Sequence, residues 1–276
     1  MSKTSINIFV NKKTVSSNDR GFNFGDGLFE TILVQEGRPL FLQEHIQRLH
    51  KGCNILGLSK PSETIIKKNI ILSIGKAKNC VIKIIYTRGN SEYGYKINNN
   101  SSPNLYFFKR IKRNKFNFNK DKKLGISNYI LKPNAYLSKI KHLNRLDQIM
   151  ISKELENHSR FCDMIAVDEN NHIIECISSN VFFVTLKRNL NPVFYTPIIK
   201  STGIEGIMRN KVISYLRNKK FEVKIKDILL NKIHLYDACF ITNSINGITF
   251  ISQIKKTKFS SYDLLYNILK QYIYST

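Results

Sequence analysis

Apolar residues follow two different periods along this chain, and this mixture limits the folds that it can adopt. Segments 27–34, 80–87 and 181–186 are rich in β-branched and aromatic residues, as is typical of buried strands. In segment 42–56 the apolar residues instead recur every three or four positions, as in an amphipathic helix. Strand-like and helix-like segments are intermixed without a regular βαβ alternation. The sequence therefore predicts an α+β fold.

A polar and basic segment near the middle of the chain divides it in two. Residues 111 to 123 are rich in Lys, Arg and Asn and poor in apolar side chains, which is typical of a linker. We therefore expect a smaller N-terminal α/β domain over residues 1–112, a linker over 113–122 and a larger C-terminal domain over 123–276.

The formal net charge of +24 at pH 7 is of the kind found in nucleic-acid-binding proteins. The lysines, however, are scattered beside Asn and Ile, and no helix-turn-helix, zinc-finger or RNA-recognition signature occurs. We therefore expect no nucleic-acid partner. A positive surface of this kind favours a small anionic metabolite as the ligand.

The apolar residues and the cysteines indicate the compartment. No run of about 18 apolar residues is present, and the N-terminus lacks a basic segment followed by an apolar stretch. The five cysteines include no CxxC pair, so the sequence predicts neither a disulfide framework nor a metal site. We expect a cytoplasmic protein with no membrane span and with free, mostly buried thiols.

Three charged side chains and one glycine-containing turn are candidate site residues. Lys141, Glu175 and Arg48 supply an amine, a carboxylate and a guanidinium, and the turn 202–206 opens a helix whose N–H groups can hold an anion. Each also has an ordinary structural interpretation, as a solvated lysine, an exposed carboxylate, the polar flank of a helix or a helix-opening turn. Only their combination distinguishes a site.

Seven segments have the order and spacing of one known family. They are NDRGFNFGDGLFET (18–31), HIQRL (45–49), IKIIYTRG (82–89), IKHLNRLDQ (140–148), ECISSNVFF (175–183), TGIEGIMR (202–209) and ITNSINGI (241–248). On these segments the chain resembles the fold-type IV pyridoxal-phosphate enzymes, a family of branched-chain aminotransferases, D-amino-acid aminotransferases and aminodeoxychorismate lyases. The resemblance implies two mixed α/β domains, a homodimer and the cofactor pyridoxal 5′-phosphate.

The resemblance also implies a role for each candidate residue. Lys141, in the larger second domain, would bind the cofactor aldehyde covalently and act as the catalytic base, and Glu175 would hold the pyridine nitrogen. The other cofactor-binding residues that it implies are Arg48, Ile204, Glu205 and Ser244 at the phosphate and Asn180 at the wall of the site.

Within the family, the chain resembles the lyases most. A Leu-Asn-Arg-Leu run follows His142, Phe29 replaces the tyrosine that is common in the aminotransferases, and Thr31 fits the lyase-like end of its motif. This implies an aminodeoxychorismate lyase, which eliminates pyruvate from 4-amino-4-deoxychorismate and forms 4-aminobenzoate for folate biosynthesis. The alternatives are a branched-chain or D-amino-acid aminotransferase, and a basic binding protein that retains the fold without catalysis.

The carboxylates of such a substrate require a cation near the cofactor. Arg88 is our leading candidate because a guanidinium can bind a carboxylate through two hydrogen bonds, and we expect Thr31 to contact the substrate as well. For Arg88, a structural ion pair or loop anchor is the alternative. Arg145 has the same two interpretations, as a structural residue or as a substrate contact.

Overall fold

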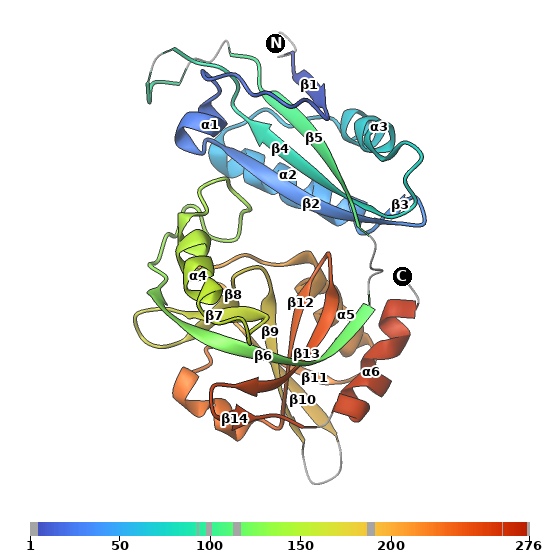
Figure 1. Cartoon of the computed structure of the whole chain (residues 1–276), viewed down its shortest axis with the longest axis vertical. Coiled ribbons are helices and arrows are strands. Elements are labelled where there is room, and N and C mark those ends of the chain that lie inside the picture. Colours follow the sequence, from blue (N-terminus) through green and yellow to red (C-terminus); the bar gives the residue numbers. More distant parts are fainter. Residues whose placement is uncertain are drawn as a thin grey trace. The chain divides into compact units, whose positions relative to one another are not determined.

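A computed structural model describes residues 5–92, 94–97, 101–112, 117–186, 191–260 and 262–274. The chain divides into two compact units (Figure 1). The first unit comprises Met1–Lys115 and Ile140–Arg145, and the second comprises Phe116–Lys139 and Leu146–Thr276. In the described part of the chain, no helix is both long enough and apolar enough to span a membrane.

The first unit is a five-stranded sheet with helices packed on it (Figure 1). The strand order is β1-β5-β4-β2-β3, in which β1 and β5 are parallel and the other neighbours are antiparallel. Helix α2 packs against β2, and α3 packs against β4 and β5. The elements are β1 (Asn7–Val10), α1 (Arg20–Phe24), β2 (Gly27–Gln35), β3 (Arg38–Pro39), α2 (Leu42–Leu56), α3 (Glu63–Ile74), β4 (Cys80–Thr87) and β5 (Asn104–Ile111).

Helix α2 has the period that the sequence predicts. Its buried residues include Ile46, Leu49 and Cys53, which lie three or four positions apart and therefore on one face. Gly57 ends the helix in a left-handed conformation with φ of 62°, and its N–H donates to Asn54 O. This local chemistry places the polar residues of α2 at defined positions beside β2.

The second unit contains a larger mixed sheet. Nine strands take part, in the order β11-β10-β9-β12-β13-β6-β7-β8, with β14 paired to β13. The elements are β6 (Asn117–Ile130), α4 (Leu146–Glu156), β7 (Asp163–Val167), β8 (Ile173–Cys176), β9 (Asn180–Leu186), β10 (Pro192–Pro197), α5 (Ile207–Asn218), β11 (Glu222–Lys226), the 3₁₀ helix η1 (Leu230–Leu235), β12 (Ala238–Asn243), β13 (Gly247–Ile254), β14 (Thr257–Lys258) and α6 (Tyr262–Tyr274).

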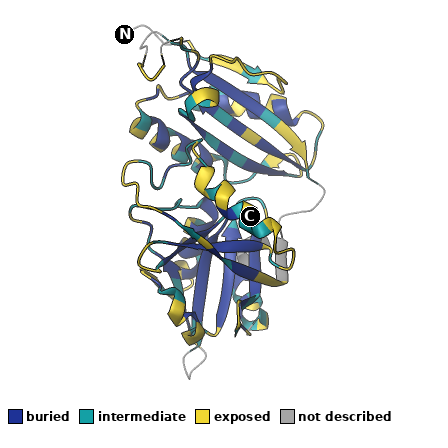
Figure 2. Cartoon of the chain, turned by 60° about the vertical axis from the view of Figure 1, so that its left-hand side comes forward, coloured by how far each residue is buried: buried dark blue, intermediate teal, exposed yellow. Residues whose placement is uncertain are grey.

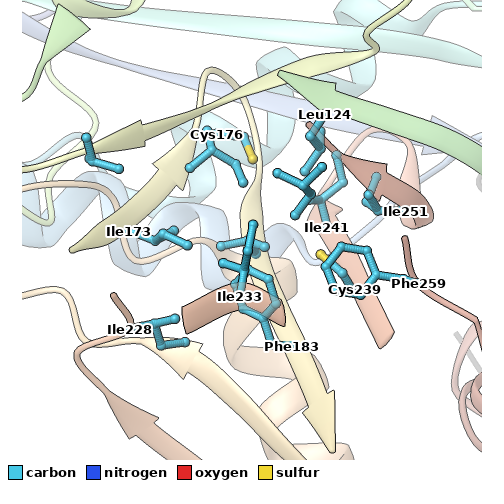
Figure 3. Packing of buried hydrophobic residues seen from close by; sticks show 14 residues of the cluster. Leu124, Ile173, Cys176, Phe183, Ile228, Ile233, Cys239, Ile241, Ile251 and Phe259 are labelled. Atoms are coloured by element: carbon cyan, nitrogen blue, oxygen red, sulfur yellow. The ribbon is translucent and has the colours of Figure 1, made fainter. Parts of the chain in front are cut away.

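Apolar side chains from several of these strands form one core. Figure 2 shows that the strands of the second unit are largely buried, and Figure 3 shows Phe183, Ile241, Ile251 and Phe259 packed together. Four of the five cysteines are also buried, which confirms the expectation of mostly buried thiols; they are Cys53, Cys80, Cys176 and Cys239. The predicted α+β class is confirmed.

Two observations concern the segments near the predicted domain boundaries. Residues 113–116 of the expected linker lie outside the described residues, and strand β6 already begins at Asn117. The segment Ile140–Arg145 clusters with the first unit, so that Lys141 belongs there and not to the larger unit. The physical reason is a long-range backbone pairing with β2, which no local pattern reveals.

Candidate active site

The segment that contains Lys141 is bound to strand β2 by backbone hydrogen bonds. The N–H of Phe29 donates to Lys141 O, and the N–H of Leu143 donates to Gly27 O, each at 2.9 Å. Gly27 permits this close approach, because a Cβ atom there would lie 2.9 Å from Leu143 Cδ1. The Lys141 Nζ atom lies 4.3 Å from the centre of the Phe29 ring, so the ring face can stabilise a positive charge on the amine.

Arg145 braces this lysine segment. Its Nε donates to His142 O and its Nη2 donates to Ile140 O, both at 2.9 Å. Nearby, the Asn144 side chain donates to Gly25 O at 3.4 Å. The lyase-like run after the lysine therefore fixes the backbone on both sides of Lys141, and the structure favours the structural interpretation of Arg145.

Arg48 and His45 share one buried carboxylate. Arg48 donates from Nε to Glu30 Oε1 at 2.7 Å and from Nη2 to Glu30 Oε2 at 2.6 Å, and His45 Nδ1 lies 2.7 Å from the same Oε2. Burial opposes ionisation of Glu30, but the charge and hydrogen bonds of Arg48, followed by those of His45, lower its pKa to about 2. The guanidinium is thereby held in a fixed orientation.

Sequence reasoning identified Arg48 but missed Glu30 and His45. A usable signal was present, because His45 and Arg48 are three residues apart and therefore lie on one face of α2. A carboxylate on the adjoining strand completes such a pair. Thr31 follows Glu30 on β2, where it is half-buried and pairs with Lys83 of β4.

The Arg88 guanidinium is hydrogen-bonded to a carboxylate and to backbone carbonyl groups of the protein. Its Nε and Nη2 donate to the Asp26 carboxylate at 2.8 and 3.1 Å, and its Nη2 and Nη1 donate to Leu56 O at 2.7 Å and Gly57 O at 3.2 Å. Burial opposes ionisation of Asp26, but the hydrogen bonds and charges of Arg88 and Arg20 lower its pKa. These contacts bind the carbonyl end of α2, so the geometry favours the anchoring role of Arg88 over substrate binding.

In the second unit, Glu175 and Asn180 hold the amide groups of one loop. Glu175, at 5% exposure, accepts a hydrogen bond from the Ile204 N–H at its Oε2, at 2.8 Å. The Asn180 side chain donates to Ile204 O at 3.0 Å. Glu205 follows in the same loop and is half-buried. Three of the predicted cofactor residues of this unit, Glu175, Asn180 and Ile204, are thus joined by hydrogen bonds.

Two glycines allow the loop before α5 to approach these side chains. Gly203 has φ of 91°, and a Cβ atom there would lie 2.8 Å from Ile174 Cγ2 and 3.4 Å from Glu175 Oε2. At Gly206 a Cβ atom would lie 2.0 Å from Asn180 Oδ1. Gly206 is also the N-cap of α5, and as a glycine it has no side chain with which to cap that helix end. Its N–H groups are suited to an anion.

The turn between β12 and β13 is organised by Asn243. Its Oδ1 accepts hydrogen bonds from the N–H groups of Ile245 at 3.0 Å and Asn246 at 2.7 Å, which shapes the turn that contains the half-buried Ser244. Beside it, the buried Thr242 Oγ1 has no hydrogen-bond partner among the described residues. Sequence reasoning missed this hydroxyl, which is a further potential donor.

These groups fit pyridoxal 5′-phosphate within each unit. The second unit offers a buried carboxylate for the ring nitrogen, the start of α5 with its glycine N-cap for a phosphate, and the Thr242 hydroxyl, which has no hydrogen-bond partner among the described residues. The first unit offers the Lys141 amine and the Arg48 guanidinium. The predicted residues therefore fall into two sets, with Lys141, Arg48, Thr31 and Arg88 in the first unit and Glu175, Asn180, Ile204, Glu205 and Ser244 in the second.

Comparison with proteins of known sequence finds relatives of two activities. The aminodeoxychorismate lyase of Vibrio harveyi is 27% identical over 246 residues, which is 86% of each chain. The D-alanine aminotransferase of Bacillus licheniformis is 27% identical over 236 residues, which cover 83% of this chain and 79% of that protein.

The solved structures show the same fold. The 4-amino-4-deoxychorismate lyase of Pseudomonas aeruginosa superposes with a TM-score of 0.83 at 24% identity and covers 94% of both chains. The branched-chain amino acid aminotransferase of Escherichia coli has a TM-score of 0.83 at 19% identity and covers 95% of this chain and 88% of its own. A profile of the amino-transferase class IV family matches residues 27–254, most of the chain. The chain therefore belongs to the class IV aminotransferase family of fold-type IV, pyridoxal-phosphate-dependent enzymes.

Proposed function

We propose that this enzyme is an aminodeoxychorismate lyase, which eliminates pyruvate from 4-amino-4-deoxychorismate and leaves 4-aminobenzoate. The observation that carries the proposal is the set of contacts made by Lys141 and by Arg145, which follows it in the sequence. Arg145 folds back onto His142 O and Ile140 O, and the Lys141 amine lies on the Phe29 ring. Both features involve residues by which the chain resembles the lyases. The similarity to lyases of Vibrio harveyi and Bacillus subtilis supports the same activity.

Each of the predicted residues has a proposed role towards the cofactor. Lys141 would bind its aldehyde, Glu175 its pyridine nitrogen, and Asn180 would shape the wall of the site. The phosphate-binding groups would be the Arg48 guanidinium, the Glu205 amide, Ser244 and the Ile204 amide, which would exchange its hydrogen bond to Glu175 for one to the phosphate. When bound, pyridoxal 5′-phosphate withdraws electrons from the substrate carbon that loses a proton.

Lys141 is the proposed acid–base group. Its Nζ accepts the proton from C4 of the substrate and returns a proton to the departing enolpyruvyl oxygen as the C3–O bond breaks. The Phe29 ring, 4.3 Å from Nζ, stabilises the amine in its charged form between these two transfers. The substrate ring becomes aromatic, which makes the elimination favourable, so the protein mainly supplies position and charge.

The alternative activity is amino-group transfer between an amino acid and a 2-oxo acid. Relatives named as branched-chain and D-alanine aminotransferases cover similar shares of the chain. The deciding experiment supplies the purified, cofactor-loaded enzyme with 4-amino-4-deoxychorismate and quantifies 4-aminobenzoate and pyruvate. We expect the two products in a 1:1 ratio. Amino-group exchange without 4-aminobenzoate would show that the protein is an aminotransferase.

Three further properties accompany this proposal. We infer that the product 4-aminobenzoate serves folate biosynthesis, that the enzyme acts in the cytoplasm and that it is a homodimer. Sedimentation equilibrium of the purified protein measures the last of these directly. A protein that binds nucleic acid in a salt-sensitive manner and shows no cofactor absorbance would instead fit a basic binding protein with this fold.

A further inference from the structure

A short turn between β8 and β9 connects the cofactor-binding residues of the second unit. Residues 177–179 form this turn, two positions after Glu175 and directly before Asn180. It is closed by a hydrogen bond from Cys176 N–H to Ser179 O at 2.7 Å. Glu175 binds the backbone N–H of Ile204, and Asn180 binds its backbone carbonyl oxygen. The turn therefore also sets the position of the loop before α5.

The same turn holds the loop between β12 and β13. Ser179 Oγ accepts a hydrogen bond from Asn243 Nδ2 at 3.1 Å. Asn243 in turn organises the amides of Ile245 and Asn246 through its Oδ1. Both proposed phosphate loops are therefore connected to residues 177–179.

A buried carboxylate, that of Asp163, binds this turn through hydrogen bonds. Asp163, the first residue of β7, is 4% exposed, and its Oδ1 accepts from the N–H groups of Met164 at 2.8 Å and Ile177 at 2.9 Å. Its Oδ2 accepts from Ser178 Oγ at 3.4 Å. Burial raises the pKa of Asp163 to about 6, against the lowering effect of these hydrogen bonds. The fold thus keeps an ionisable group where an uncharged side chain would be buried more readily.

We propose that Asp163 is a positioning residue, whose carboxylate fixes the turn 177–179 and thereby orients Glu175 and the two phosphate loops. The proposal rests on the function proposed above, since it assumes that these groups hold the cofactor. Asp163 does not touch the reacting atoms. It acts through Ile177 and Ser178.

The same hairpin provides a matched control. Asp168 lies at the opposite end of β7, where its Oδ1 accepts from the N–H groups of Asn170 at 2.9 Å and His172 at 2.8 Å. It is a second turn-binding aspartate of the β7–β8 hairpin, and no cofactor residue is attached to its turn. Asparagine in place of either aspartate keeps one acceptor oxygen but removes the negative charge, which weakens the hydrogen bonds from two backbone N–H groups. Only Asp163 is connected to Glu175.

The test compares Asp163→Asn with Asp168→Asn in the full-length protein. Cofactor-free protein is titrated with pyridoxal 5′-phosphate to obtain a dissociation constant, and amide hydrogen exchange is followed by mass spectrometry. For D163N we expect a dissociation constant raised about tenfold, with faster exchange at 177–180, 202–206 and 243–247. For D168N we expect a constant within about twofold of the wild type and faster exchange at 168–172 alone.

Equal effects of the two variants, or wild-type exchange at 202–206 and 243–247 in D163N, would overturn the positioning role. A wild-type protein that binds no cofactor would overturn the proposed function, while the exchange comparison would still decide about Asp163. If D163N does not fold, Ser179→Ala replaces it, because this change removes the hydroxyl that hydrogen-bonds both Asp163 and Asn243 but leaves the Asp163 carboxylate in place. Faster exchange at 243–247 with unchanged exchange at 202–206 supports the proposal, and unchanged exchange at both contradicts it.

Discussion

At the scale of single residues, the buried carboxylate of Glu30 makes the first unit sensitive to acid. Its pKa is lowered from 4.5 to about 2 by Arg48 and His45 against the effect of burial. A group with a depressed pKa in the folded protein stabilises the fold fully above its unfolded pKa and loses this contribution as the pH falls through the folded value. Glu30 therefore contributes to stability at neutral pH, and the contribution disappears between about pH 4.5 and pH 2.

Glu30→Gln tests this link. At pH 7 the variant should lose about 3 kcal/mol of unfolding free energy, because the charge pair with Arg48 is gone, and the difference from the wild type should shrink as the pH is lowered towards 2. Chemical denaturation over this pH range measures both values. The control is Glu63→Gln, in an exposed pair with Lys67 on α3, for which we expect no resolvable difference in unfolding free energy because solvent screens the pair. A difference for E30Q that does not depend on pH would contradict the assignment.

Arg88→Met distinguishes the two interpretations of that residue. The guanidinium binds Asp26 and the last carbonyls of α2, so its removal should lower the unfolding free energy by about 2 kcal/mol. The KM for the substrate should stay within about twofold in protein that remains folded, since no substrate contact is lost. Thermal unfolding and steady-state kinetics separate these effects. A large rise in KM with unchanged stability would identify Arg88 as a substrate-binding residue instead.

At the scale of elements, the close approach of the loop before α5 to β9 is the feature most easily disturbed. Gly206 has φ of −66°, so alanine is allowed there by its backbone, but its Cβ would lie 2.0 Å from Asn180 Oδ1. We expect Gly206→Ala to displace the start of α5 and to raise the dissociation constant of the cofactor at least about tenfold. Absorbance titration measures this value. The double variant Asn180→Ala/Gly206→Ala should recover part of the lost thermal stability, and no recovery would argue against the steric cause.

Local sequence patterns predicted elements well where one face is buried. The spacing of Ile46, Leu49 and Cys53 gave the extent of α2, and Gly57 gave its end. Strand β10 was not predicted; it begins at Pro192 and ends at Pro197, and proline is depleted in strands. The site residues came from the family resemblance. Glu30 was missed although the spacing of His45 and Arg48 was a signal for a carboxylate partner, and Asp163 could not be predicted because it contacts a turn distant in sequence.

At the scale of the whole molecule, the proposed chemistry depends on one amine. Lys141→Ala should lower kcat more than about a thousandfold, because both the covalent link to the cofactor and the proposed base are lost. Thermal stability should change little, since the backbone pairing of this segment with β2 does not involve the side chain. Product formation and thermal unfolding of the same preparation measure the two effects. Normal turnover would show that a different lysine carries the cofactor.

At this scale, composition gives no sign that the short segment Ile140–Arg145 clusters with the first unit. A boundary drawn from composition assigns each half of the chain to one unit, but the chain passes from the first unit into the second, returns for Ile140–Arg145 and leaves again. Six residues are too few to show a compositional change. Only their pairing with Gly27 and Phe29 reveals where they belong.

The pairing of Ile140–Arg145 with the first unit affects how the protein can be divided into two fragments. If the polypeptide were cut between Lys115 and Phe116, the C-terminal fragment would carry the strip Ile140–Arg145, whose docking strand lies on the N-terminal fragment. Each fragment would expose hydrogen-bonding edges that only the other can satisfy, as in strand addition. Split halves of this enzyme should therefore recognise each other through the very peptide that bears the reactive amine, so that reassembly and recovery of function become a single event.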